Sequence, residues 1–277
     1  MSKRTSDIGL ATLMLFAGLA LSACGGGGSS SSGSSGGDDG TLKPGLYNAK
    51  IEYTGDLPTQ EGLTSYLSPT GKFAIVYGEL GVSIGELSFD GTDISGTSND
   101  YRLTDPADES KNPKPPEPRG FLEFKGLQGI EEGSLAGTVN SQTSATFTAS
   151  DATGKVYARV SLKRVESVGD LGLSLERVSG VFTQVDPPNV ALRVDDSGSM
   201  FAQYPKNIGC GLNGTLSVPD SSINIFEITY TMESCENENH EGAYSGVGFL
   251  VPAGNQSKTL IFTAHNGKVG MQFEGTE

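Results

Sequence analysis

The chain has 277 residues and a formal net charge of −14 at pH 7, with 39 glycines, 13 prolines and no tryptophan. This negative charge argues against binding to nucleic acid or to anionic lipid through a basic face, because both require clustered lysine and arginine. The many glycines and prolines favour frequent turns over long helices, so the composition indicates an all-β protein.

The first residues have the layout of an export signal. Lys3 and Arg4 precede an apolar run from Ile8 to Leu21, which small residues follow, and this order is typical of a secretory signal peptide. The run is shorter than the roughly 20 residues that a helix needs to cross a bilayer. We therefore expect residues 1–23 to be removed on export rather than to span a membrane.

Leu21, Ser22, Ala23 and Cys24 resemble the bacterial lipobox, in which a leucine and two small residues precede a cysteine. The resemblance implies that Cys24 receives a diacylglycerol through a thioether bond, becomes the new N-terminus and is acylated there by a fatty acid such as palmitate. Several acyl chains anchor a protein stably, because each buried methylene contributes about 0.8 kcal/mol. Gly25 stands where an aspartate would indicate inner-membrane retention, so we expect an outer-membrane lipoprotein, on the periplasmic face or at the cell surface.

The segment from Gly25 to Gly40 consists almost wholly of glycine and serine. Such a composition cannot bury enough apolar surface to offset the entropy of ordering. We assign residues 24–40 as the lipidated cysteine and a disordered tether, whose expected end-to-end distance is roughly 20 to 24 Å. The tether would hold the folded part clear of the lipid headgroups.

The rest of the sequence contains an internal repeat, in which five stretches of the first half match five stretches of the second half in the same order. They are 45–47 with 180–182, 66–77 with 193–204, 85–88 with 214–217, 132–137 with 241–246, and 147–160 with 262–273. Five ordered matches indicate an internal duplication. We place the two units at residues 41–164 and 175–277, joined by a linker at residues 165–174.

Within each unit, apolar and polar residues alternate with a period of two, as in Phe226–Met232 and Ala158–Lys163. Turn clusters such as Asp90–Asp93 separate these stretches at short spacing, which is typical of antiparallel meanders. We count seven or eight strands per unit. The predicted fold is all-β, with two tandem antiparallel meander β-barrels, lipocalin-like or folded as sandwiches, related by internal duplication. Whether they form separate barrels or one joined sheet stays open.

Cys210 and Cys235 remain in an oxidising compartment once Cys24 carries lipid. The predicted hairpin of Leu212–Val218 and Ile223–Met232 brings them nearly opposite one another, so we predict a disulfide. At the equivalent point the first unit has a proline-rich insert instead. Such divergent loops carry function more often than the scaffold does. The candidate binding residues are Asp105, Asp108, Glu109, Glu233, Glu236, Glu238, His240 and Glu241.

Two motifs raise the question of metal binding. Residues Asp195–Met200 resemble the metal-ion-dependent adhesion site of von Willebrand factor type A domains, but their counterpart in the first unit, Ser68–Lys72, is typical of a hairpin turn. We therefore predict a turn. The carboxylates around His240 could bind Ca²⁺, or a transition metal if the imidazole joined them, although a solvated acidic loop is the favoured interpretation. We expect neither a metal nor a cofactor.

The sequence offers little for catalysis. His240 and His265 are its only histidines; His265 falls in a predicted turn, and neither has the context of a nucleophile motif. Glu131 and Glu132 are adjacent at a predicted strand end, where their side chains would point to opposite faces. We expect a protein that is not an enzyme, although folding could still bring two carboxylates together.

The lipobox, the Gly/Ser tether and the glycine-punctuated short strands together resemble Gram-negative surface lipoproteins with barrels like those of transferrin-binding protein B. The resemblance implies a binding function and transfers no ligand-contacting residues. The leading hypothesis is a non-enzymatic module whose loops bind an envelope or host protein. The alternatives are a carrier of a small apolar ligand inside one barrel and an inhibitor of a hydrolase.

Overall fold

The computed structural model describes residues 40–55, 57–77, 81–102, 121–123, 132–184, 190–203, 210–252 and 257–277. The expected signal peptide, Cys24, nearly all of the tether, Glu131 and the candidate residues Asp105, Asp108 and Glu109 lie outside these ranges. Within them, no helix is long and apolar enough to cross a membrane.

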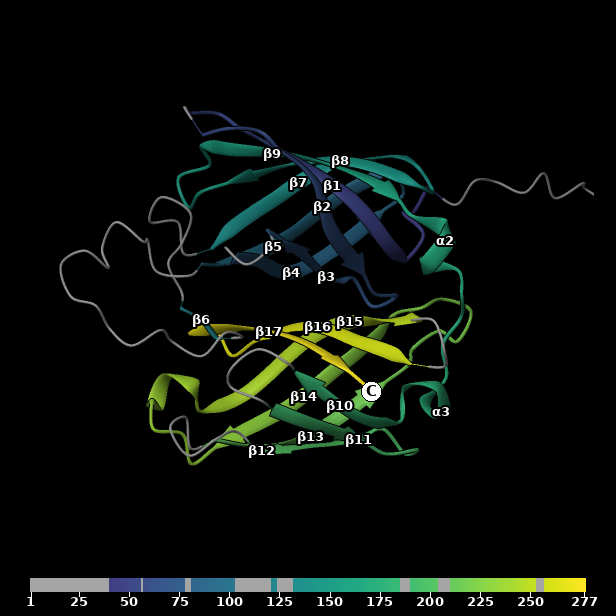
Figure 1. Ribbon diagram of the computed structural model, residues 1–277. Helices are drawn as coiled ribbons and strands as arrows, with labels where there is room; N and C mark the ends of the chain where they lie inside the picture. Colours follow the sequence, from purple (N-terminus) through teal and green to yellow (C-terminus); the bar gives the residue numbers. More distant parts are fainter. Residues whose placement is uncertain are drawn as a thin grey trace, which may run out of the picture. The chain divides into compact units, whose positions relative to one another are not determined.

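The first unit forms a closed barrel of eight antiparallel strands, which we call barrel 1 (Figure 1). Its last strand pairs with its first, so that the sheet has no open edge. The strands are β1 (Gly45–Tyr53), β2 (Gln60–Leu67), β3 (Lys72–Val76), β4 (Gly81–Asp90), β5 (Asp93–Arg102), β7 (Gly133–Ser141), β8 (Ser144–Ser150) and β9 (Val156–Arg164).

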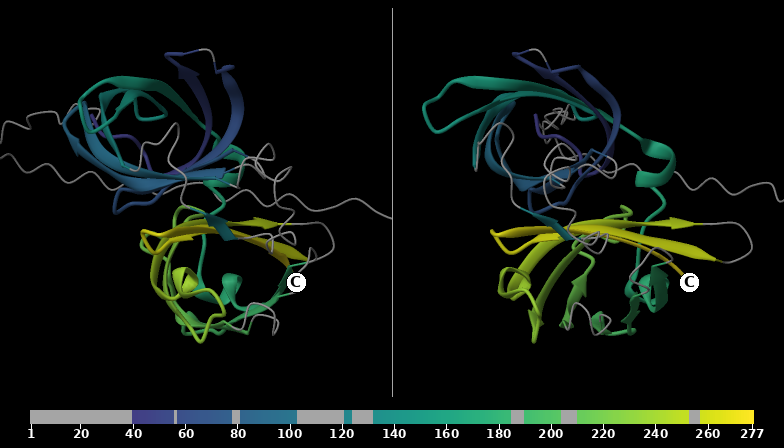
Figure 2. Two further views of the ribbon diagram at one scale, coloured as in Figure 1. Left: turned by 90° about the vertical axis from the view of Figure 1, so that its left-hand side faces the viewer. Right: turned by 60° about the vertical axis from the view of Figure 1, so that its left-hand side comes forward.

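The second unit forms barrel 2, which the short helices α2 (Glu166–Gly169) and α3 (Leu175–Val178) connect to barrel 1. Figure 2 shows both barrels from two further sides. The strands of barrel 2 are β10 (Gly180–Gln184), β11 (Val190–Val194), β12 (Ser199–Gln203), β13 (Gly211–Ser217), β14 (Phe226–Glu233), β15 (Gly242–Pro252), β16 (Lys258–His265) and β17 (Val269–Thr276), with the 3-10 helix η2 (Glu238–His240) between β14 and β15.

Barrel 2 closes less completely than barrel 1. Its first and last strands, β10 and β17, meet in one pair, Thr183 with Thr276. Beside that seam, Val269–Met271 of β17 pairs with β6 (Phe121–Glu123), a strand of the first unit that follows its proline-rich insert. The prediction of two tandem meander barrels is confirmed. The units form two barrels and not one joined sheet, although one strand of the first unit pairs with the second barrel.

Equivalent glycines underlie the duplication. Gly71 and Gly198 close the hairpin turns after β2 and β11 with φ angles of +94° and +83°. At each position a Cβ would overlap a carbonyl oxygen, that of Leu87 or of Leu216. The amides of Leu87 and Leu216 in turn donate to the glycine carbonyls at 2.8 and 2.7 Å. The two turns are therefore built in the same way and require glycine for the same reason.

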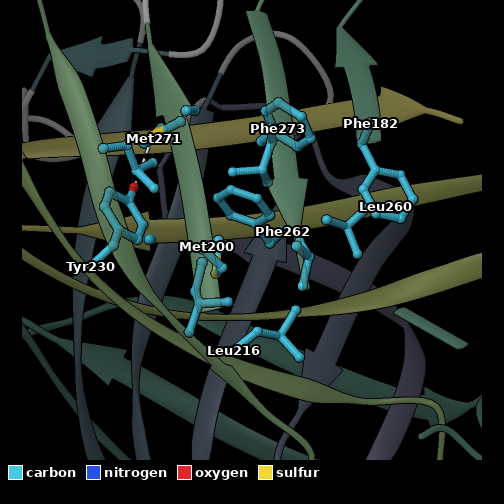
Figure 3. Close-up of a cluster of buried hydrophobic side chains, with 14 of the residues drawn as sticks. Phe182, Met200, Leu216, Tyr230, Leu260, Phe262, Met271 and Phe273 are labelled. Atoms are coloured by element: carbon cyan, nitrogen blue, oxygen red, sulfur yellow. Dashed lines mark hydrogen bonds between the residues drawn. The ribbon is translucent and has the colours of Figure 1, made fainter. Parts of the chain in front are cut away.

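In both barrels, the residues at alternate positions of each strand face inward and fill the interior. Barrel 1 encloses Tyr47, Phe73 and Phe147, with smaller aliphatic side chains around them. Barrel 2 encloses a larger aromatic set that includes Phe182 and Phe262, and Figure 3 shows this cluster. The Phe262 and Phe273 rings stack with their centroids 5.0 Å apart, and the Tyr230 and Tyr244 rings stack at 4.8 Å.

A third buried cluster joins the two barrels. It combines outward-facing residues of barrel 1, such as Tyr66 and Ile84, with Val247 and Phe249 of barrel 2. The Tyr66 hydroxyl donates to Thr263 Oγ1 at 3.1 Å inside this cluster. Because apolar side chains fill the contact, the two barrels pack as they would within one domain.

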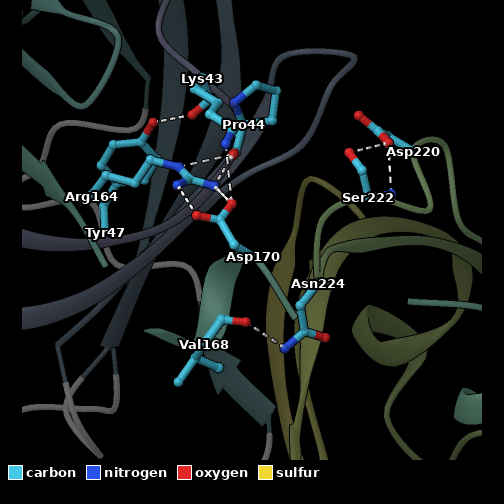
Figure 4. A network of polar contacts seen from close by, with 9 residues as sticks. All are labelled: Lys43, Pro44, Tyr47, Arg164, Val168, Asp170, Asp220, Ser222 and Asn224. Carbon is cyan, nitrogen blue, oxygen red and sulfur yellow. Dashed lines mark hydrogen bonds and ion pairs between the residues drawn. The ribbon is translucent and has the colours of Figure 1, made fainter. Parts of the chain in front are cut away.

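The linker is held by a polar network, shown in Figure 4. The Arg164 guanidinium donates to both carboxylate oxygens of Asp170, at 2.8 and 2.6 Å, and to the Pro44 carbonyl. The Asn224 side chain donates to the carbonyls of Val168 at 3.2 Å and Leu250 at 2.6 Å. These bonds fix α2 against both barrels.

Two boundaries differ from the sequence prediction. Strand β14 begins at Phe226, because Ile223 and Ile225 instead pack between the barrels while Asn224 bonds to the linker. His265 is the last residue of β16 and not part of a turn. Its Nδ1 lies 2.6 Å from the hydroxyl of Tyr101, which belongs to barrel 1.

Candidate functional site

The barrel interiors bear on the hypothesis of an apolar ligand carrier. Barrel 2 is packed with aromatic, methionine and aliphatic side chains (Figure 3). The cavity in barrel 1 has a volume of about 20 Å³. A water molecule needs roughly 10 to 15 Å³, whereas ligand pockets measure about 300 to 1,000 Å³. As described, the interior of barrel 1 has room for about one water.

One end of the barrel 1 cavity is polar. Asp100 is buried there at 2% exposure, where it accepts hydrogen bonds from Ser83 and Tyr157. Burial and the nearby Asp100 carboxylate raise the pKa of Tyr77 and of Tyr157, so both phenols stay protonated. Among the described residues, Asp100 is the one carboxylate that lines this cavity, so these residues supply a single carboxylate there and not the pair that a glycosidase-like enzyme requires.

The predicted disulfide between Cys210 and Cys235 is present, with the Cα atoms 4.2 Å apart. Cys210 directly precedes β13 and Cys235 follows β14, and the pair Gly211 and Glu233 lies just inside the bond. The disulfide therefore closes the open end of the β13–β14 hairpin, as its sequence spacing indicates.

The loop beyond the disulfide carries the second set of candidate binding residues. Glu233, Glu236, Glu238 and Glu241 are exposed, and together with Lys268 they line a shallow depression. Glu241 also accepts a hydrogen bond from the Cys235 amide at 3.0 Å. The disulfide and this bond give an acidic surface a defined shape.

His240 does not join these carboxylates at the surface. It is the last residue of η2 and is 5% exposed, and its carbonyl accepts from the Tyr244 hydroxyl at 2.9 Å. The short helix turns this side chain inward, which the sequence did not reveal. Among the described residues, no group of three or more His, Cys, Asp or Glu side chains could hold a metal ion.

Residues Asp195–Ser199 form the hairpin turn expected from the repeat. Asp195 Oδ1 accepts from the Ser197 amide and the Ser199 amide, each at 2.9 Å, and from the Ser197 hydroxyl at 2.6 Å. These bonds lower the pKa of Asp195. The same arrangement surrounds Asp151 in barrel 1. In both turns the carboxylate stabilises the local backbone.

The outer face of barrel 2 carries two cross-strand rows of outward-facing side chains, which we call the open wall. The first row is Val181, Arg193, Phe201, Asn213, Thr231 and Ala243, and the second is Ser199, Thr215, Thr229, Ser245 and His265. All except Ser245 and His265 are exposed. The rows exist because the alternate positions on the same strands point inward to fill the core.

The open wall is nearly free of charge, although the protein is strongly acidic. Arg193 is its one ionised side chain at neutral pH, because burial lowers the pKa of His265. Among the described residues, Arg193 has no ion pair or hydrogen-bond partner for its side chain. It lies between Val181 and Phe201, whose side chains are 51% and 52% exposed. Two large apolar groups therefore flank a cation at the surface.

A groove of about 570 Å³ lies on the open wall and crosses β13–β16. Its lining includes hydroxyl and amide side chains, the His265 imidazole, and the small residues Gly214 and Ala243. The hydroxyls of Thr215 and Thr229 bond to one another across the strands at 3.1 Å. Phe201 is the cross-strand neighbour of Asn213, so its ring lies beside the end of the groove. The serine, threonine and asparagine residues that line the groove are Asn213, Thr215, Thr229, Thr231, Ser245 and Asn266.

The open wall was not predicted from the sequence, because divergent loops and charged residues point to other parts of the chain. The alternation on each strand does show that Val181, Arg193 and Phe201 share a face of their strands. Their alignment in one row depends on the register between β10, β11 and β12, which the sequence of a single strand does not contain. The signal in the sequence for this surface is that Val181 and Phe201 are large apolar residues at outward-facing positions of their strands.

No protein-family model matches this sequence, and no curated protein matches it. Among solved structures, Aeromonas veronii immune modulator A is similar over 86% of this chain and 95% of that chain, with 11% sequence identity and a TM-score of 0.35.

Proposed function

We propose that the protein is a lipid-anchored, non-enzymatic binding module of the bacterial envelope, and that the open wall of barrel 2 is its main contact surface. The observation that carries this proposal is that the two rows of the open wall include one charged side chain, Arg193, in a protein with net charge −14. The cores of binding surfaces are depleted in charged residues and enriched in aromatic residues and arginine. Phe201 and Arg193 fit that composition.

The anchor in this proposal is the lipid on Cys24. It is supported by Leu21–Cys24, which resemble a lipobox, and by the Gly/Ser tether that follows. We propose the outer membrane as its location, on either the periplasmic face or the cell surface. In this arrangement the tether lets barrel 2 approach a ligand that is itself held in the envelope or on a host surface.

The acidic loop after the disulfide provides a second contact in the same proposal. Glu233, Glu236, Glu238 and Glu241 would meet a basic face on an envelope or host protein, because opposite charges steer association. Inhibition of a hydrolase is one form that such binding could take. A carrier function finds less support, because side chains fill the barrel interiors.

Photocrosslinking in intact cells tests this proposal. The full chain is produced with a benzoylphenylalanine in place of Phe201, and, as a matched control, in place of Val156, an exposed apolar residue of barrel 1. We expect crosslinked adducts at position 201 and few at position 156. A Cys24→Ser chain should leave the membrane fraction and lose those adducts. Equal adducts at both positions, or none at either, would contradict the assignment of the open wall.

A further inference from the structure

We propose that the groove on the open wall binds a neutral oligosaccharide. The Phe201 ring would pack against the face of one sugar, and Asn213, Thr229 and Thr231 would exchange hydrogen bonds with its hydroxyl groups. This inference rests on the proposed function, since it names the class of ligand that the open wall takes.

The charge of the groove selects a neutral ligand. Among the described residues, no carboxylate, lysine or arginine lines it, and His265 in its lining is held neutral because burial lowers its pKa. An anionic polymer would meet the repulsion of a protein with net charge −14. A cationic ligand would find no carboxylate among the described lining residues to offset the loss of its hydration.

The polar groups of the groove suit a ligand rich in hydroxyls. Threonine and serine hydroxyls each donate one hydrogen bond and accept others, and an asparagine side chain offers an acceptor oxygen and two donor hydrogens. Six such side chains line one groove, and of these Asn266 already uses its amide in hydrogen bonds within the protein. Sugar hydroxyls have the same double capacity, so each can be satisfied from either direction, and the Thr215–Thr229 bond shows that these groups are close enough to act together.

Phe201 supplies the apolar part of the site. It is 52% exposed, so its ring is accessible to a ligand. The apolar C–H face of a sugar can pack on an aromatic ring whose neighbour is an amide such as Asn213. The groove volume of about 570 Å³ falls within the range of roughly 300 to 1,000 Å³ that ligand sites occupy.

A second copy of the chain fits this surface less well. Two copies that met through the two rows of the open wall would bring Arg193 of each into a contact whose row residues include no carboxylate. Burying a charge without a partner is costly. A neutral glycan leaves Arg193 at the margin of the site, where it can remain hydrated or donate to a sugar hydroxyl.

Affinity electrophoresis of the full lipidated chain in a neutral detergent tests the inference. The gels contain dextran, xylan, glucomannan or glycogen as neutral polysaccharides, and alginate as an anionic one. We expect at least one neutral polysaccharide to retard the protein and alginate to leave its mobility unchanged. Loss of the Phe201 ring or of the Asn213 amide should weaken binding about tenfold, measured with Phe201→Ala and Asn213→Ala.

Val156→Ala is the matched control, because Val156 is an exposed apolar residue of barrel 1 and lies outside the open wall. Its affinity should stay within twofold of the wild type, and circular dichroism melts should show that all three variants are folded. Retardation by alginate, or by none of the neutral polysaccharides, would overturn the inference. If adducts still form at position 201 and consist of protein alone, the glycan assignment fails while the proposed function stands. If no adducts form there either, both fail.

Discussion

Asp170 fixes the linker through a guanidinium that is itself buried. The Arg164 side chain is 1% exposed and that of Asp170 is 37% exposed. Hydrogen bonding to Arg164 lowers the pKa of Asp170 from 3.8 to about 2. Removal of the carboxylate would leave a buried cation with only the Pro44 carbonyl as an acceptor in this network.

We therefore expect Asp170→Asn to lower the free energy of unfolding by about 1 kcal/mol at pH 7, a value discounted for the exposure of Asp170. Because the folded state favours the ionised carboxylate, this contribution is fully present above pH 3.8 and is lost as the pH falls through about 2. Urea denaturation of wild type and variant at pH 7 and pH 2 measures it. The exposed Asp196→Asn serves as control, and a difference that persists at pH 2 would count against this account.

Single residues were predicted well where chemistry constrained them and poorly where conformation decided their environment. The Cys210–Cys235 bond followed from cysteine count and hairpin spacing, and it is present. The Arg164–Asp170 pair was not predicted, because it requires the path of the α2 linker to be known. His240 was expected at the surface and is buried, because the short helix η2 sets the direction of its side chain.

Among the strands, the hairpin turns closed by Gly71 and Gly198 show what the repeat preserves. Each glycine has a positive φ and leaves no space for a Cβ beside the next strand. We expect Gly71→Ala and Gly198→Ala each to destabilise the protein by about 2 kcal/mol or more, from backbone strain together with overlap. Thermal denaturation would measure this.

Gly267→Ala separates the two contributions. Gly267 has a φ of +85°, but nothing lies within 4 Å of its missing Cβ, so its substitution carries the strain without the overlap. It should cost about 1 kcal/mol. Equal losses at Gly267 and Gly198 would show that the close approach to Leu216 contributes nothing.

Alternation and turn residues were enough to predict the strands of both barrels, since each half-buried strand carries its own period of two. Strand β6 was not predicted. Its three residues are too few to show a period, and it exists through pairing with β17, far away in the sequence. The start of β14 was misplaced for a similar reason, because Ile223 and Ile225 extend the apolar pattern while they serve the contact between barrels.

For the molecule as a whole, the contact between the barrels is the feature that the alternation of apolar and polar residues does not predict. In β3, successive residues from Phe73 to Val76 are buried, because Phe73 and Ile75 fill barrel 1 while Ala74 and Val76 face barrel 2. A strand buried on both faces loses its period of two. The loss of this period in β3 is the signal in the sequence for a contact between the barrels.

Phe249→Asp tests the mechanical role of this contact. Phe249 is 5% exposed and its ring centroid lies 5.4 Å from that of Tyr66. A carboxylate buried there should cost about 3 kcal/mol or more and should uncouple the barrels, so that urea denaturation shows two transitions. Phe201→Asp, on the open wall, places the same charge in water and should shift the midpoint little. A single transition at the wild-type midpoint for Phe249→Asp would show that the contact does not couple the barrels.

The seam of barrel 2 also has a consequence for the timing of folding. Strand β17 is the last strand of that barrel to be synthesised, and it pairs with β16, with β10 and with β6 from the first unit. Neither the barrel wall nor the crossing strand can be completed until β17 has emerged, so folding must wait for contacts that are distant along the chain. Barrel 1 can close as soon as β9 has been made, whereas barrel 2 stays open until its last strand is complete.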